Sequence, residues 1–401
     1  GPRLTEQVDI LVVGGGIHGV GVAQAAAAAG HSVLLVEKSR LAAGTSSRSS
    51  KLIHGGLRYL ETYQFRLVRE CLRERRILLR VAPELVRLES FHLPVYKGAR
   101  RAPWLLTVGL GLYTALAGFG RGSGFSRIAP GEFAAVDGLR PDGLRAVLRY
   151  YDARTDDRLL TRAVMESAIS LGARLWQQAE CVGGTLTATG AVARIRLADS
   201  EREVSCRVLI NAAGPWAAQL HGDLLPGATA PAIELVQGTH IVLRDFHTRY
   251  CYYLENPRDG RGIFVMPWYG HSLVGTTETR FQGKPDAVRP LDTEIRYLRK
   301  ALRYFVPQSV QGIDGAAKAF TGLRVLPAAE GHAFNRSRET RFVVDRARDP
   351  RVLTILGGKL TAYRATACKV LDRIGNGLPQ RKARADTARL PLVPPDDADA
   401  S

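Results

Sequence analysis

Short apolar runs separated by glycine-rich or polar stretches dominate the start of the chain. Residues 8–13 (VDILVV) form such a run, which is typical of a parallel strand buried on both faces. A glycine-rich loop and an alanine-rich segment follow, and the latter ends at Gly30, a residue that favours a helix C-terminus. The run 31–37 (HSVLLVE) predicts a second strand that ends in an acid. This order indicates an α/β fold with a parallel sheet.

The spacing of apolar positions changes further along the chain. Residues 60–80 carry apolar side chains at helical spacing and predict an amphipathic helix. Alternation in 191–197 and 203–210 predicts a small antiparallel sheet, and the chain is expected to return to the first domain near 341–370. Four runs predict a second, antiparallel sheet that binds the substrate: 233–243, 250–255, 262–267 and 272–277.

Residues 103–119 contain no charged side chain. With internal glycines they are shorter than the roughly 20 apolar residues that a membrane-spanning helix needs. Basic residues flank the segment at Lys97, Arg100, Arg101 and Arg121. We therefore expect 97–121 to lie on an anionic membrane surface rather than to cross it, the alternative being a buried core helix.

Composition excludes several classes of protein. With 45% hydrophobic and 23% charged residues, the chain is expected to be globular, neither disordered nor embedded in a membrane throughout. The net charge of +18 is compatible with an anionic substrate, an anionic membrane or nucleic acid. The arginines are dispersed and no nucleic-acid-binding motif is present, so nucleic acid is not an expected partner.

The five cysteines are odd in number and widely spaced, and none forms a CxxC or other metal-ligand pattern. We expect free thiols in a reducing compartment, and therefore a cytoplasmic protein without a metal site. Contact with a membrane is expected only at the inner face of the cytoplasmic membrane. The cysteines are Cys71, Cys181, Cys206, Cys251 and Cys368.

The loop after the first strand matches GxGxxG at Gly14, Gly16 and Gly19. The first glycine allows a tight turn, the second lets the backbone approach a pyrophosphate, and the third lets helix and strand pack closely. Glu37 ends the second strand, where a carboxylate can bind ribose hydroxyls. The pattern predicts a dinucleotide site.

Two later segments favour FAD over NAD. INAAGPWA (210–217) is typical of a strand and turn that close over the dinucleotide in two-domain flavoproteins, and GGKLTAYR (357–364) starts a helix. The positive N-terminal end of that helix can stabilise the anionic reduced flavin.

Residues 46–61 (SSRSSKLIHGGLRYLE) combine hydroxyls, Lys51, His54, Arg58, Tyr59 and two glycines. This density of hydrogen-bond donors is typical of a segment that meets an anionic ligand. It predicts an acidic small substrate beside the flavin.

Together these segments carry a family resemblance. The chain resembles the FAD-dependent, membrane-associated, aerobic-type glycerol-3-phosphate dehydrogenases over residues 8–375, as a short form without their helical C-terminal domain. The stretches that match are 14–21, 45–61, 65–70, 152–160, 211–217, 237–243, 267–278, 321–327 and 357–364.

The resemblance implies a Rossmann-like α/β FAD-binding domain, similar to those of D-amino-acid oxidase and glutathione reductase, with an inserted antiparallel substrate domain. We expect the FAD domain at 8–88, 150–225 and 323–380, the substrate domain at 89–149 and 226–322, and a flexible tail at 381–401.

The resemblance also implies oxidation of sn-glycerol 3-phosphate to dihydroxyacetone phosphate, with electrons passed to a quinone-type acceptor. It assigns the substrate site to Arg58, Tyr59, His240, Arg324, Arg338, Lys359 and Thr361. His54 and His240 are the candidates for the base that takes the C2 hydroxyl proton, and Arg324 can stabilise a developing alkoxide. The sequence does not separate the two histidines.

The cofactor site is expected to draw on several segments. Its predicted residues are Gly14, Gly16, Ile17, His18, Glu37, Lys38, Thr45, Ser46, Ser50, Lys51, Val182, Ala213, Gly214, Trp216, Gly357, Gly358, Lys359, Leu360 and Thr361. The alternatives are a dehydrogenase of another phosphorylated polyol in a specialised biosynthetic pathway, and an oxidase that uses oxygen. A homodimer is a further hypothesis.

Overall fold

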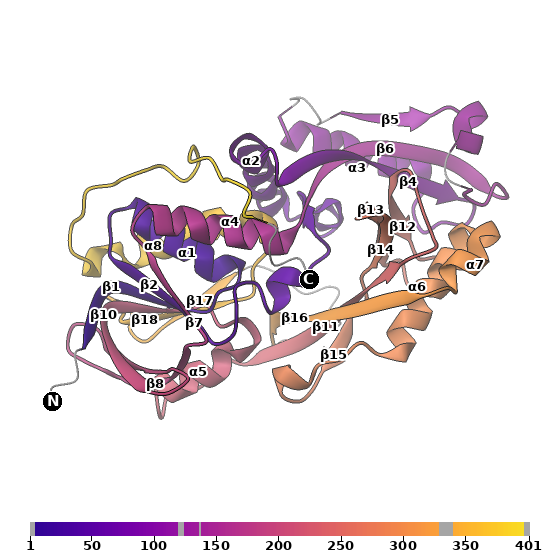
Figure 1. The fold of residues 1–401 in the computed structure, drawn as a ribbon. Coiled ribbons are helices and arrows are strands. Elements are labelled where there is room, and N and C mark those ends of the chain that lie inside the picture. The colour runs from indigo at the N-terminus through magenta and orange to yellow at the C-terminus, as the bar shows by residue number, and fades with distance from the viewer. Residues whose placement is uncertain (1–4, 119–123, 136–137, 329–339, 397–401) are drawn as a thin grey trace.

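Two β-sheets lie side by side in the computed structural model, which describes residues 5–118, 124–135, 138–328 and 340–396 (Figure 1). Sheet A contains both the first strands of the chain and the last, as the indigo and orange-yellow ribbons show. Sheet B consists of segments inserted between them. Segments distant in sequence therefore meet where the sheets adjoin.

Sheet A is the nucleotide-type sheet. In spatial order it contains β17 (Arg341–Val344), β18 (Val352–Leu356), β10 (Glu201–Asn211), β1 (Glu6–Val13), β2 (Val33–Glu37) and β7 (Arg174–Gln177), with β8 (Glu180–Leu186) and β9 (Ala191–Arg196) as a hairpin beside β10. The pairs from β18 to β7 are parallel, and β17 is antiparallel.

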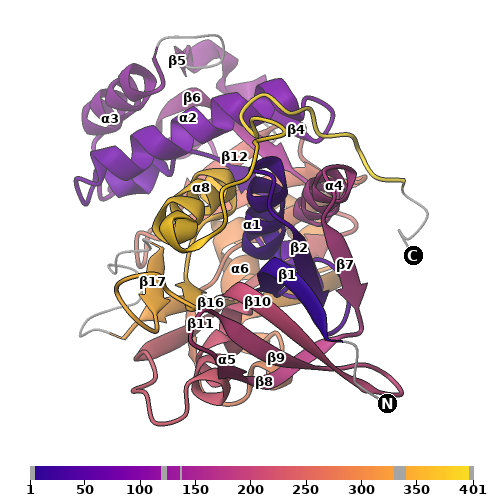
Figure 2. The same cartoon turned by 90° about the vertical axis from the view of Figure 1, so that its left-hand side faces the viewer.

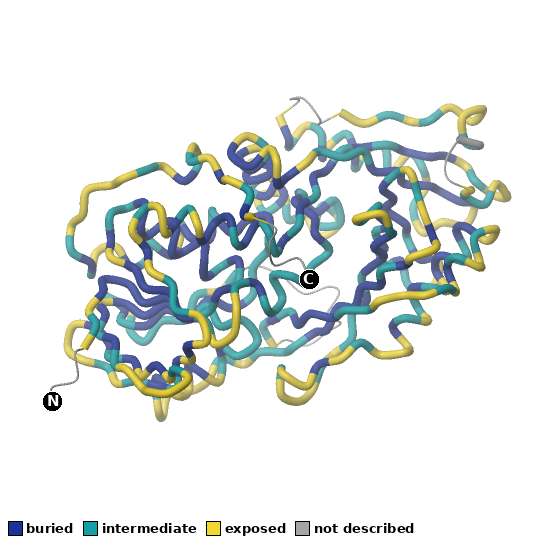
Figure 3. The backbone as a smooth tube through the Cα atoms, viewed as in Figure 1, coloured by how far each residue is buried: buried dark blue, intermediate teal, exposed yellow. Residues whose placement is uncertain are grey.

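Helices cover both faces of sheet A, which explains the apolar run predicted as its first strand. Helices α1 (Ile17–Ala28), α4 (Asp157–Ser170) and α8 (Tyr363–Ile374) pack on one face, and α5 (Ala217–Leu224) with the β8–β9 hairpin packs on the other (Figure 2). Because β1 is covered on both sides, residues 8–13 are all buried. Figure 3 shows this burial in dark blue.

Sheet B carries the second domain. In spatial order it contains β15 (Thr279–Phe281), β11 (Ile233–Leu243), β14 (His271–Gly275), β13 (Gly262–Trp268), β12 (Cys251–Glu255), β4 (Val86–Tyr96), β6 (Leu144–Thr155) and β3 (Leu52–Ile53), while β16 (Ala317–Pro327) pairs with β11 and β5 (Phe125–Ile128) with β6. Its helices are α2 (Phe65–Val81), α3 (Pro103–Leu116), α6 (Asp292–Phe305) and α7 (Val310–Ile313). Short 3-10 turns occupy Thr45–Ser47, Leu57–Leu60, Pro130–Ala135, Gly214–Trp216, Pro285–Ala287, Pro307–Ser309, Leu360–Ala362 and Gly375–Gly377.

The predicted α/β class with an inserted second sheet is confirmed. Two details differ from the expectation. Sheet B is mixed, because β12 runs parallel to β4. Strand β3 pairs with β6, so Leu52 and Ile53 belong to sheet B rather than to the FAD domain, and β16 continues in sheet B to Pro327.

The described part of the tail lies against the first domain. Arg381 forms an ion pair with Asp9, Arg384 donates its backbone N–H to the carbonyl of Ala28, and Leu392 is buried. Polar composition suggested a flexible segment, whereas these contacts hold residues 381–396 along α1 and the end of α2.

Within the uncharged segment, residues Pro103–Leu116 form helix α3 on the surface. Its inner side, which includes Leu110 and Tyr113, is buried, whereas Trp104 and Val108 are 69% and 61% exposed. Among the described residues, no helix is long and apolar enough to cross a membrane.

Candidate active site

The predicted dinucleotide residues lie at one edge of sheet A. Parallel strands β1, β2, β10 and β18 all end at this edge, where ligands bind in such sheets. Gly14 follows β1 with a φ of +113°, and a Cβ there would lie 2.2 Å from the carbonyl oxygen of Ala212. A Cβ on Gly19 would lie 1.8 Å from the carbonyl oxygen of Gly14. Only glycine lets the loop and the α1 N-terminus come this close.

Two side chains hold the phosphate-binding loop in place. Glu37 accepts a hydrogen bond from the backbone N–H of Gly15 at 3.0 Å, and its other oxygen accepts from Ser39. Ser46 accepts from the N–H of Ile17 at 2.8 Å. The acid at the end of β2 therefore lies beside the glycine-rich loop that precedes α1.

His18 joins this loop to the last predicted cofactor segment. A Cβ on Gly358 would lie 2.6 Å from His18 Nε2, so the ring packs directly on that glycine. Burial lowers the pKa of His18 to about 4. The imidazole is therefore neutral at physiological pH and can serve a pyrophosphate only as a hydrogen-bonding group.

The other predicted cofactor residues surround the same edge. Lys38 places its ammonium 3.4 Å from the ring centroid of Trp216, and Thr45 donates to the carbonyl of Leu323 at 2.8 Å. Val182 lies in β8. Ala213, Gly214 and Trp216 follow β10, and Gly357, Gly358, Lys359, Leu360 and Thr361 follow β18.

This arrangement fits FAD. The ring nitrogens Nδ1 of His18 and Nε1 of Trp216 are buried at this edge without a hydrogen-bond partner among the described residues, as expected where a ligand supplies one. Helix α1 begins directly after the glycine-rich loop, so its N-terminus can stabilise the charge of a pyrophosphate there.

Lys51 is placed differently from the prediction. Its ammonium forms an ion pair with Asp157 at 2.6 Å and donates to the carbonyl of Ser47, and both charged side chains are buried. The side chain thus ties the loop to the N-terminus of α4 rather than to the cofactor edge. Its neighbour Ser50 contacts His240.

A first group of predicted substrate residues gathers around His54. Its backbone N–H donates to Thr361 at 3.0 Å, and its ring lies 6.2 Å from that of Phe264. The ammonium of Lys359 lies 3.2 Å from the ring centroid of Tyr59. Segments 54–59 and 359–361, 300 residues apart in sequence, therefore form one cluster.

A second group centres on His240 in β11. The ring is stacked on Phe320 at 5.2 Å, and Nε2 lies 3.0 Å from the hydroxyl of Ser50. Burial, together with the positive charges of Lys51 and Arg324, lowers the pKa of His240 to about 3. The imidazole is therefore neutral, and it is only 3% exposed.

Register connects the two groups. His240 is paired with Gly275, and Gly275 with Phe264. Because paired residues on neighbouring strands project to the same face, His240 and Phe264 share the face of sheet B that meets His54. A Cβ on Gly275 would lie 2.1 Å from His240 Cδ2, so the glycine makes room for the imidazole.

Arg324 is fixed by residues that the sequence did not single out. Its guanidinium donates to Glu278 at 3.3 Å and to the carbonyl of Thr277 at 3.2 Å. The hydroxyl of Thr277 in turn donates to Glu294, a buried carboxylate that also accepts from Thr239. A glutamate on an amphipathic helix gives no sequence signal of such a role.

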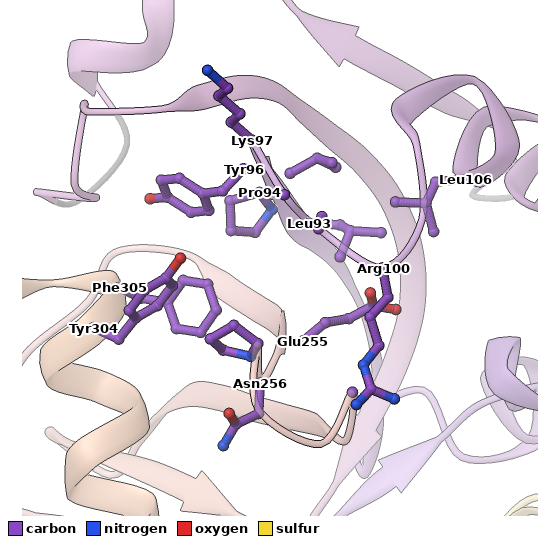
Figure 4. Close-up of a pocket in the computed structure, with 15 residues that line it drawn as sticks. Leu93, Pro94, Tyr96, Lys97, Arg100, Leu106, Glu255, Asn256, Tyr304 and Phe305 are labelled. Atoms are coloured by element: carbon purple, nitrogen blue, oxygen red, sulfur yellow. The ribbon is translucent and has the colours of Figure 1, made fainter.

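Arg338, which was predicted to bind the substrate, lies outside the described residues. The pocket in Figure 4 lies between the end of β4, the start of α3 and residues 255–260, with Tyr96, Arg100, Glu255 and Tyr304 around it. None of the residues that line it is among the predicted site residues.

The chain is similar to flavoproteins over nearly its whole length. Residues 9–364 match the family of FAD dependent oxidoreductases. D-erythritol 1-phosphate dehydrogenase of Brucella abortus is 34% identical, covering 94% of this chain and 75% of that protein. A glycerol-3-phosphate dehydrogenase of Pseudomonas aeruginosa is 36% identical, covering 92% and 72%.

Solved structures agree with this. The glycerol-3-phosphate dehydrogenase of Bacillus halodurans complexed with FAD superposes with a TM-score of 0.75 at 27% identity, covering 96% of this chain and 68% of that one. The L-alpha-glycerophosphate oxidase of Mycoplasma pneumoniae, at 19% identity and a TM-score of 0.76, has the same fold.

Proposed function

Because the chain belongs to the family of FAD dependent oxidoreductases, we propose that it oxidises sn-glycerol 3-phosphate to dihydroxyacetone phosphate. The observation that carries this proposal is the convergence of basic side chains on one face of sheet B. Arg58 and Lys359 lie around the His54 cluster, and Arg324 lies near His240. Several fixed cations suit a phosphate monoester, and arginine can grip it with two parallel hydrogen bonds.

In this proposal the predicted site residues have different roles. FAD, when bound, supplies the atom N5 that accepts the hydride from C2. Arg58, Lys359 and, by resemblance, Arg338 hold the phosphate, while Arg324 faces the reacting oxygen. Tyr59 and Thr361 orient the chain segments around them.

We infer that His54 takes the C2 hydroxyl proton. A pKa of about 3 makes the imidazole of His240 a weak base at neutral pH, although it can still accept a hydrogen bond. His54 is half-buried, its backbone N–H donates to Thr361, and its ring lies beside that of Phe264. His240 is then a hydrogen-bonding residue for the substrate oxygen.

A four-carbon substrate is the second candidate, because a relative at 34% identity acts on D-erythritol 1-phosphate. Both substrates place a phosphate monoester beside a secondary alcohol, so the same cations serve either. The test is reduction of the bound flavin by each substrate under anaerobic conditions. The loss of the flavin's visible absorbance measures this reduction. Bleaching by glycerol 3-phosphate but not by glycerol or sarcosine supports the proposal, faster bleaching by D-erythritol 1-phosphate selects the second candidate, and no bleaching by either phosphate ester rules out both.

We further propose that electrons pass to a quinone in an anionic membrane that the protein meets through α2 and α3. The two helices lie side by side (Figure 2), and Leu72 of α2 and Leu110 of α3 belong to the same apolar core cluster. The outer side of α3 exposes Trp104, Leu105, Val108 and Leu112. One side of α2 exposes five arginines at helical spacing: Arg66, Arg69, Arg73, Arg76 and Arg80. Apolar and basic surface side by side suits a helix pair lying on anionic lipid.

Co-sedimentation with phosphatidylglycerol vesicles tests this contact. Arg69→Gln with Arg73→Gln, and separately Trp104→Ser with Val108→Ser, should each release the protein into the supernatant. The matched control, Arg296→Gln with Arg348→Gln, removes two exposed arginines from other surfaces and should leave binding unchanged. Equal binding of all variants to these vesicles would refute the proposed contact. Equal binding of the wild-type protein to vesicles of phosphatidylcholine alone would refute it as well. A short-chain quinone should reoxidise the reduced flavin faster than oxygen does.

A further inference from the structure

We propose that Tyr113 of α3 is a positioning residue for the active site, which holds the segment His54–Gly56 through the backbone amide of Gly55. Nothing in the sequence pattern marks this tyrosine, which stands in the uncharged surface helix. Its hydroxyl accepts a hydrogen bond from the N–H of Gly55 at 2.8 Å. The proposal deepens the proposed function, since it assigns a scaffold to His54.

Two hydroxyls from different parts of the chain hold consecutive amides of this segment. The N–H of His54 donates to Thr361, which follows β18 in the FAD domain, and the N–H of Gly55 donates to Tyr113 in the second domain. The two peptide groups that flank the Cα of His54 are therefore each held by a hydrogen bond, one from each domain. The imidazole that we propose as the base is carried by this Cα.

The hydroxyl of Tyr113 is itself fixed by a buried network. Its single proton is shared between the two carboxylate oxygens of Asp152, each 2.8 Å away, and Asp152 also accepts from Arg75 at 2.6 Å. All three side chains are buried. Burial raises the pKa of the Tyr113 hydroxyl well above its usual value, so the group keeps its proton for Asp152. Its lone pairs are thus left to accept from Gly55.

Gly55 is closely packed between α2 and α3. A Cβ on this residue would lie 2.7 Å from the ring of Tyr113 and 2.7 Å from Leu72 of α2. Because Gly55 has no Cβ, its backbone approaches α3 more closely than the backbone of any other residue type could. Displacing the tyrosine hydroxyl therefore moves the peptide of Gly55 and, with it, the orientation of His54 against Phe264.

A buried ionic network is not needed merely to attach a surface helix, because apolar packing of the same volume does this as well or better. The helix already has such packing through Leu110 and Ala117. The hydrogen bonds instead specify one position of Gly55. Arg75 and Tyr113 both donate to Asp152, and the amide of Gly55 donates to Tyr113, so the series of bonds ends beside His54 and is assigned to the site.

Tyr113→Phe in the FAD-bound protein tests the proposal. It removes only the hydroxyl and keeps the ring. We expect wild-type FAD content, a limiting rate of flavin reduction by glycerol 3-phosphate at least tenfold lower, and an apparent Kd for glycerol 3-phosphate within about threefold of wild type. Hydrogen exchange in the peptide that contains residues 52–57 should become faster.

Tyr150→Phe is the matched control, because Tyr150 is buried in the same core with its ring 6.3 Å from that of Tyr113 and is not part of this chain of hydrogen bonds. It should leave rate and exchange unchanged. Equal effects of the two variants, or wild-type rate and exchange in Tyr113→Phe, overturn the proposal. If Tyr113→Phe does not accumulate, Asp152→Asn should give the same separation of rate from Kd, and loss of folded protein in both assigns Tyr113 to stability alone. If glycerol 3-phosphate does not reduce the wild-type flavin, the proposed function fails, while the exchange measurement still tests Tyr113.

Discussion

Gly275→Ala is a small change that should disable the site while leaving FAD bound. The glycine lies in β14 opposite His240, and the added Cβ would lie 2.1 Å from Cδ2 and 2.6 Å from Cγ and Nε2 of the imidazole. Ordinary carbon contacts are about 3.5–4.0 Å, so the ring must move by roughly 1.4 Å or more.

That movement has two consequences. The ring is now 3.0 Å from the Ser50 hydroxyl and stacked on Phe320, so a shift of this size away from Ser50 breaks the hydrogen bond and disturbs the stack. Overpacking of this kind costs about 1–3 kcal/mol of stability. A misplacement of about 1 Å at a reacting group can lower a rate ~100-fold.

Stopped-flow reduction of the flavin under anaerobic conditions measures the effect. We expect Gly275→Ala to retain its FAD and to show a limiting reduction rate roughly 100-fold below wild type. Gly222→Ala is the matched control, because a Cβ there meets no atom within 4 Å, and it should reduce at the wild-type rate. If the effect passes through His240, Gly275→Ala should add little in a His240→Ala background. A rate within twofold of wild type in Gly275→Ala would refute the reasoning.

Three further predictions concern Arg324, the pKa values of His240 and His18, and the C-terminal tail. Arg324→Ala should lower kcat/KM by at least 30-fold, about 2 kcal/mol, whereas Arg324→Lys should recover part of it because the charge returns without the fork; unchanged steady-state kinetics in Arg324→Ala would remove it from the site. Burial lowers the pKa of His240 to about 3 and that of His18 to about 4, so below pH 6.5 the unfolded chain binds protons that the folded chain does not. Stability should therefore fall as pH drops from 6.5 to 4, and urea midpoints of His240→Asn should depend less on pH; an equal slope in both proteins would contradict this. Leu392→Ala should lower the free energy of unfolding by about 2 kcal/mol because Leu392 is buried, while Val393→Ala at an exposed neighbouring site should not; equal urea midpoints would show that the tail contributes no stability.

Local chemistry explains why the sequence alone brings the glycine-rich loop and Glu37 together. Gly14 and Gly19 are required by a loop and a helix that are adjacent in the chain, and Glu37 ends the next strand, so spacing alone places them together. The α/β class and the inserted second sheet follow from the same periodic runs. FAD as cofactor follows from the additional segments after β10 and β18.

The partners of side chains were decided only by the tertiary structure. Lys51 stands in a segment rich in hydrogen-bond donors, yet its ammonium lies against Asp157, 106 positions away, because a buried charge must be paired. Polar composition at 381–401 predicted a loose tail, whereas in its described part Arg381 and Leu392 contact the first domain.

The same limit applies to Gly275 and Tyr113. Each looks unremarkable in its own segment, because its importance lies in a contact with His240 or Gly55 across strand register or helix packing. Backbone preferences and hydrophobic periodicity act between neighbours in sequence, so the chain alone determined its elements and the nucleotide loop. Side-chain packing and hydrogen bonding act between neighbours in space, and only the assembled sheets decided that His240 is buried and neutral while His54 is half-buried beside Phe264.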